Sequence, residues 1–298
     1  MASASTLTHS YGTGQSILIA RRRILGALGW IVCGLAFLAL AVAMLWILAT
    51  VVVRGLPALS PHVFTHITQG TGGGLLNAIE GTALIGVGSM LIAIPLGVTA
   101  GLYVALFGHS LWAKIVRFLS DVLVGVPSIV LGYFGYVTMV EELGWGFSYA
   151  AASITLAILC LPYICRSTEL ALLQVSDALR EAAYAVGAGD RTVAWRICLP
   201  AARPGIVTGI LLAFAISIGE TAPLIYTAGW SDYLWTGQFI HSPMGYLTYA
   251  IWAFVNEPFA RTQALAYAAA FLVTLFVLLI GIASRFLVRD GRGGSGGL

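Results

Sequence analysis

The sequence predicts an all-α integral membrane protein with six transmembrane helices. Hydrophobic residues make up 59% of the 298 residues and charged residues only 9%, against about 25% charged residues in soluble domains. The mean hydropathy is +0.93. A water-soluble protein of this size could not cover its surface with so few charges. The net charge of +3, without a dense basic run, argues against nucleic acid as a partner.

Uncharged runs long enough to cross a bilayer define the spans, since a crossing helix needs about 20 apolar residues. The six runs cover approximately residues 24–53, 81–107, 122–140, 147–165, 205–226 and 263–287. We therefore predict a cytoplasmic tail over 1–23, a transmembrane domain over 24–288 and a second cytoplasmic tail over 289–298.

A seventh uncharged run, residues 238–256, is almost long enough to cross. It carries Tyr246, Tyr249 and Trp252, and such rings are typical of the membrane–water boundary. We interpret the surrounding segment, about 228–262, as an outer interfacial or re-entrant helix.

The distribution of basic residues predicts the orientation of the chain. With six crossings, 13 of the 15 Lys and Arg residues fall on the side of the two termini. Only Arg54 and Arg261 fall on the other side. Because Lys and Arg concentrate in cytoplasmic loops, both termini are expected in the cytoplasm. No cysteine or histidine pattern in the sequence predicts a metal site.

Prolines separate the inner spans from the outer ones. Pro95, Pro127, Pro162 and Pro223 lie in or at the end of the second to fifth predicted helices. Proline frees a backbone carbonyl that lipid cannot satisfy, so these breaks belong against protein or a water-filled path. We expect these four helices to form the functional core.

The segment of about 166–203, between the fourth and fifth predicted helices, holds a third of all charged residues. Ser176 and Asp177 predict a helix start, and Gly187 predicts its end. A second short helix is expected to begin at Asp190 and to end before Pro200. Ala182, Ala183 and Val186 are expected to share one apolar side, which suits docking another protein; the alternative is a connector that merely caps the bundle. 

This segment resembles the EAA loop of ABC importer permeases, in which the loop couples the membrane subunit to an ATPase. The residues that carry the resemblance are Glu181, Ala182, Ala183, Gly187, Ile197, Leu199 and Pro200. The resemblance implies a type I ABC importer permease core. The sequence contains no P-loop, and its only lysine, Lys114, lies outside any glycine-rich context. ATP and magnesium are therefore expected on partner ATPase subunits, and this chain is expected to bind no cofactor and to be no enzyme itself.

Two stretches resemble phosphate-specific permeases of the PstA type: residues 125–130, GVPSIV, with Gly132, and residues 219–224, GETAPL. With the EAA loop, the resemblance extends over roughly residues 70–290. It implies a translocation path that includes Pro127, Ser128, Arg166, Glu220, Thr221 and Pro223. Arg166 resembles a basic position at the cytoplasmic mouth, and an equally plain interpretation is a positive-inside anchor. The family often has an Arg shortly before GETAPL, where this chain has residues 215–217, AIS, so the missing cation would come from a partner permease.

Glu220 stands out independently of any resemblance. A carboxylate within a span costs on the order of 3 kcal/mol or more, so it usually faces a partner or a water path. We expect Glu220 about 16 residues into a continuous fifth helix. It either pairs with a basic residue of another chain or simply holds the bundle together; direct binding of an anion is the least attractive role.

The resemblance implies a multi-pass permease of the plasma (inner) membrane that imports inorganic phosphate. Its expected partners are a homologous permease chain, two ATP-binding subunits, an extracytoplasmic phosphate-binding protein and the lipid bilayer. Alternatives are the same machinery for sulfate or molybdate, or an ATP-independent secondary transporter or channel. A membrane-embedded hydrolase is disfavoured, because no nucleophile–base set can be recognised.

Overall fold

A computed structural model of the chain describes residues 7–292, in two compact units, Met1–Val53 and Arg54–Leu298. Helix α1 (Leu7–Ala58) forms the described part of the first unit and ends in the second. Its apolar side chains are exposed all around the helix (Trp30 is 82% exposed), as suits a helix surrounded by lipid. The helix already begins at Leu7, so the predicted boundary between tail and span at residue 24 does not coincide with a helix start.

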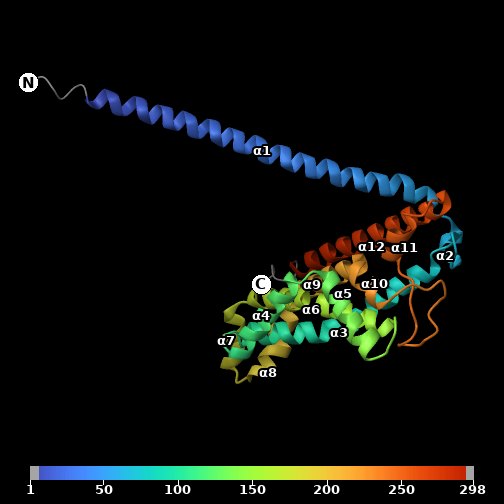
Figure 1. Cartoon of the computed structure of the whole chain (residues 1–298). Helices are drawn as coiled ribbons and strands as arrows, with labels where there is room; N and C mark the ends of the chain where they lie inside the picture. Colours follow the sequence, from blue (N-terminus) through green and yellow to red (C-terminus); the bar gives the residue numbers. More distant parts are fainter. Residues whose placement is uncertain (1–6, 293–298) are drawn as a thin grey trace, which may run out of the picture. The chain divides into compact units, whose positions relative to one another are not determined.

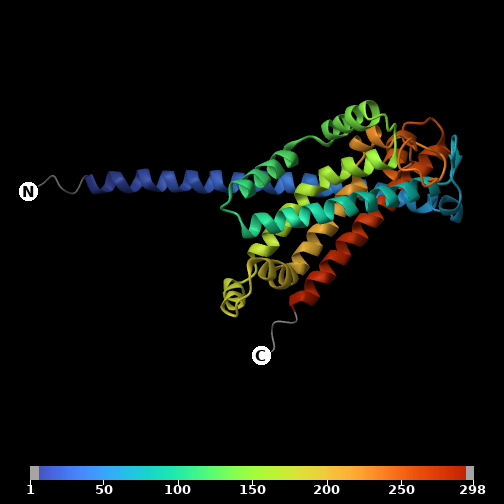
Figure 2. The same ribbon diagram turned by 90° about the horizontal axis from the view of Figure 1, so that it is seen from below.

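Four long helices form the body of the second unit. They are α3 (Leu76–Leu106), α6 (Tyr149–Leu173), α9 (Leu199–Gly219) and α12 (Ala260–Arg292). Helix α3 packs on α6, α6 on α9, and α9 on α12, as Figures 1 and 2 show. Glycines bring α3 close to α6, since a Cβ at Gly97 would meet Ile164 and one at Gly101 would meet Thr168. Helix α6 is therefore central, with α3 and α9 on either side of it.

Short elements cap and connect these helices. They are α2 (Pro61–Thr65), the antiparallel pair β1 (Thr68–Gln69) and β2 (Gly72–Gly73), α4 (Leu111–Gly125), α5 (Ser128–Gly135), the π-helical η1 (Tyr136–Glu142), α7 (Asp177–Ala185), α8 (Asp190–Thr192), the π-helical η2 (Val193–Cys198), α10 (Ala222–Thr227) and α11 (Leu247–Phe254). The all-α prediction is confirmed. Within the described residues, five helices are long and apolar enough to cross a membrane, and a sixth crossing results if the bent pair formed by α4 with α5 and η1 counts as one.

The predicted continuous span 122–140 is wrong in its geometry. Helix α4 ends at Gly125, α5 begins at Ser128, and the two halves are bent by 101°. Val126 between them has extended backbone angles (φ −76°, ψ 126°). The cause is Pro127, which lacks an N–H and forces the preceding residue out of the helical region.

The outer segment agrees with its interpretation as a non-crossing element. Its one helix within the described residues, α11, has eight residues, about 12 Å of length against a hydrocarbon core of about 30 Å. The backbone before it, residues 228–246, is irregular. At the C-terminal end, α12 continues to Arg292, and residues 293–298 of the predicted tail lie outside the described part of the chain.

Candidate coupling surface and translocation site

The predicted coupling helix is α7, and its start and end fall where the sequence indicated. Ser176 precedes the helix, although its side chain makes no capping hydrogen bond. Gly187 follows it with φ +84°, a left-handed conformation that glycine adopts without strain. The next amide, of Ala188, donates to the carbonyl of Ala183 at 3.1 Å. The glycine thus closes the helix and turns the chain towards Asp190.

The two faces of α7 differ from the prediction. Ala183 is buried at 8% exposure and packs with Leu172, Val193 and other residues of one apolar cluster. Ala182 is exposed, and Val186 is 85% exposed. The expected common face of all three residues is wrong, because neighbours in a helix point about 100° apart while i and i+4 align. Ala183 anchors α7, and Ala182 with Val186 leaves an apolar face outward, beside the exposed Glu181.

Two side chains fasten α7 to its neighbours. The Arg180 guanidinium donates to the carbonyl of Leu172 at 2.6 Å, at the end of α6, where unpaired carbonyls and the helix dipole attract cations. The Tyr184 hydroxyl donates to the carboxylate of Asp190 at 3.1 Å, and this hydrogen bond raises the pKa of Tyr184. The sequence gave no signal for the role of Arg180, because its acceptor is a backbone carbonyl.

The second half of the coupling segment runs directly into α9. The segments α8, η2 and α9 form one helix over Asp190–Gly219, so the predicted end before Pro200 is wrong. Pro200 occupies the first turn of α9, a position that proline tolerates. Ile197 and Leu199 are half-buried and Pro200 is exposed. One helix therefore leads from the coupling segment into the membrane core.

Arg166 lies within α6, because this helix continues to Leu173, and not at the start of a loop. Its guanidinium contacts the carboxylate of Glu169 at 2.7 Å. The same carboxylate, which is 3% exposed, accepts two hydrogen bonds from Arg117 of α4, at 2.6 and 3.0 Å. Arg166 is thus held in an ion-pair network that ties α4 to α6. Glu169 and Arg117 were missed as site residues; the Arg–Glu pair at i, i+3 was the available signal.

The two stretches that resemble phosphate permeases meet in space. Helix α5 packs on α10, and a Cβ added to Gly132 would overlap the backbone of Pro223. The Ser128 side chain is a hydrogen-bond partner of the Glu220 carboxylate. Five of the six predicted path residues, Pro127, Ser128, Glu220, Thr221 and Pro223, therefore gather around the junction of α5 with α10, and Arg166 lies apart in its own ion-pair network.

Glu220 does not lie inside a continuous helix, contrary to the prediction. Helix α9 ends at Gly219, Glu220 is extended (φ −73°, ψ 135°), and α10 begins at Ala222. The Thr248 hydroxyl donates to the freed carbonyl of Glu220 at 2.7 Å. Among the described residues, the ion pairs do not include Glu220. The break places this carboxylate at the end of a spanning helix, half-buried and beside Ser128.

Comparisons with known proteins agree on one family. Residues 93–292 match the family described as "Binding-protein-dependent transport system inner membrane component". The chain is 45% identical to the phosphate transport system permease protein PstA 2 of Mycobacterium bovis, over 90% of this chain and 89% of that protein. It is 42% identical to the phosphate transport system permease protein PstA of Pasteurella multocida, over 80% of this chain and 86% of the relative. An inward-facing structure of the MetNI methionine ABC transporter has a similar fold (TM-score 0.57, 21% identity, 73% of this chain and 94% of that chain).

Proposed function

Because this chain belongs to the family of binding-protein-dependent transport system inner membrane components, it is a permease of an ABC phosphate importer, and we propose how its two sites divide the work. It is a multi-pass protein of the plasma membrane and a transport subunit rather than an ATPase. In the proposal, α7 receives the movement of a partner ATPase, and the junction of α5 with α10 lines the path of the anion.

The observation that carries this proposal is the continuous helix Asp190–Gly219. One end is tied to α7 through the hydrogen bond between Tyr184 and Asp190. The other end stops at Glu220, beside Ser128. A packed helix moves as a rigid element, so a displacement of α7 is transmitted along it to the break.

The proposed partners follow from the two surfaces. Two ATP-binding subunits, one for each permease chain, would receive the exposed face of α7 formed by Glu181, Ala182 and Val186. A homologous permease chain would complete the path and supply a cation for Glu220. A bare carboxylate repels phosphate, so Glu220 is proposed to position that cation rather than to bind the anion. An extracytoplasmic binding protein would deliver phosphate, with both termini of this chain in the cytoplasm.

Cross-linking tests the docking of α7. In a chain whose one exposed cysteine among the described residues, Cys33, is replaced by Ser, Val186→Cys should form a disulfide with single cysteines introduced in the ATP-binding subunit. The control is Leu234→Cys, at an exposed position (42%) in the segment expected outside. Equal cross-linking of both variants, or none at Val186→Cys in an intact complex, would contradict the docking.

A further inference from the structure

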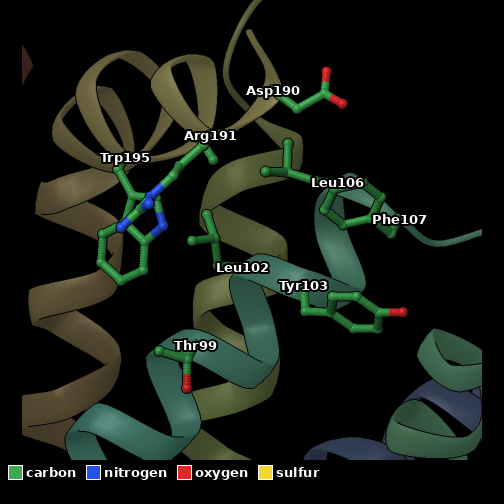
Figure 3. A pocket seen from close by; sticks show the side chains of 9 residues that line it. Thr99, Leu102, Tyr103, Leu106, Phe107, Asp190, Arg191 and Trp195 are labelled. Atoms are coloured by element: carbon green, nitrogen blue, oxygen red, sulfur yellow. The ribbon is translucent and has the colours of Figure 1, made fainter.

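An open groove lies beside the coupling segment, between the end of α3 and the start of the helix Asp190–Gly219. It has a volume of about 390 Å³. Figure 3 shows Leu102 and Leu106 between the rings of Trp195 on one side and Phe107 on the other. Phe107 is 45% and Trp195 46% exposed. The groove therefore presents an apolar floor with aromatic walls that the described chain leaves uncovered.

One end of this groove is cationic. A second hollow of about 580 Å³ is lined by Arg191, Thr192, Trp195 and Arg196, and it shares Arg191 and Trp195 with the first. Both arginines are exposed, and the ion pairs among the described residues include neither. Asp190 also borders the groove, but its carboxylate accepts the hydrogen bond of Tyr184 on the side of α7. Two guanidinium groups thus adjoin an apolar channel.

The place of the groove in the fold selects the kind of ligand. It lies at the end of α3 and at the start of Asp190–Gly219, two helices that are long and apolar enough to cross a membrane. The residues at such ends meet the lipid headgroups, where Trp and Tyr rings and arginines are enriched. An amphipathic molecule with an anionic head and an apolar tail matches both the charge and the lining. Basic residues near the membrane surface attract anionic lipids by about 1 kcal/mol each.

We propose that this groove binds an anionic phospholipid. Its phosphate contacts Arg191 and Arg196, and one acyl chain lies along Leu102 and Leu106. The bound lipid fills the space between α3 and η2 and so supports the segment that joins α7 to the membrane core. Inorganic phosphate shares the chemistry of the head but would leave the apolar floor uncovered.

Lipid binding by the purified complex tests the proposal. The complex is extracted in detergent and titrated with phosphatidylglycerol or phosphatidylcholine, and bound lipid is counted by native mass spectrometry. Wild type should retain phosphatidylglycerol in preference to phosphatidylcholine. R191Q/R196Q should bind phosphatidylglycerol at least about tenfold more weakly. The control R21Q/R22Q, with the same change of charge in α1, should bind like wild type.

Two further arms keep the outcome decisive. T99W, at an exposed position that borders the groove, should block the acyl chain while both arginines remain. An excess of inorganic phosphate should not displace the lipid. The proposal is overturned if both double variants lose lipid equally, if T99W binds like wild type, or if phosphate displaces the lipid. It is also overturned if the groove variants keep their lipid and lose the ATP-binding subunit, since the groove would then be a protein interface.

Discussion

Gly132 of α5 lies directly against Pro223 of α10, so closely that a Cβ at position 132 would overlap the backbone of the proline. The two residues are 91 positions apart in the sequence, and each follows a break, at Val126–Pro127 or at Glu220–Thr221. Their contact holds Ser128 beside Glu220. The translocation site therefore depends on the absence of a side chain at residue 132.

Gly132→Ala should disrupt this contact. Its Cβ meets backbone, which cannot rotate away, and overpacking of this kind costs about 1–3 kcal/mol. We expect phosphate uptake to fall severalfold at matched complex levels. Gly125→Ala is the control, because nothing lies within 4 Å of a Cβ there. Similar uptake by the two variants would argue against the role of the junction.

Gly187→Val should weaken coupling while the protein still inserts into the membrane. There is space for a side chain at Gly187, but φ is +84°, which costs a non-glycine residue roughly 1–2 kcal/mol. The measurement is co-purification of the ATP-binding subunit together with uptake. Gly189→Val is the matched control: its position is equally open, and its backbone is extended (φ −78°, ψ 162°). The account fails here if Gly187→Val behaves like Gly189→Val.

Glu220→Gln should impair transport or assembly far more than Glu142→Gln. Glu220 is half-buried at the break, and Glu142 is exposed. If a basic residue of the second permease pairs with Glu220, removing one partner costs about 3–5 kcal/mol. Phosphate uptake is compared in membranes matched for assembled complex. Wild-type uptake by Glu220→Gln would remove this residue from the functional set.

Arg117→Gln should destabilise the protein more than Arg166→Gln. Arg117 donates two hydrogen bonds to the buried Glu169, and Arg166 donates one and is 50% exposed. Hydrogen bonds to a charged group are worth about 1.5–3 kcal/mol. The expected result is a larger fall in the thermal unfolding temperature for Arg117→Gln. The reverse order would mean that α4 is not held to α6 through Glu169.

The family and the coupling segment could be predicted because their signals are local. Gly187 needs a left-handed backbone whatever packs around it, and its spacing from Glu181 and Pro200 is written in the sequence. The comparisons confirm the predicted permease family. The end of α7 was predicted correctly for the same reason.

The errors concern features that depend on distant residues. Pro127 indicated a break, but the 101° bend depends on how α5 packs against α10. The break at Glu220 was missed, although Gly219 and Pro223 flank it, because the freed carbonyl finds its donor in Thr248, 28 positions away. Glu169 was overlooked because its principal partner, Arg117, is 52 positions away on another helix.

Phosphate uptake by proteoliposomes that contain the complete complex tests the central claim most directly, namely that this chain couples ATP hydrolysis on partner subunits to the import of phosphate. Labelled phosphate should enter only with the ATP-binding subunits and ATP present, and excess sulfate or molybdate should not compete. The account would be contradicted by undiminished uptake without the ATP-binding subunits, or by equal competition from sulfate or molybdate.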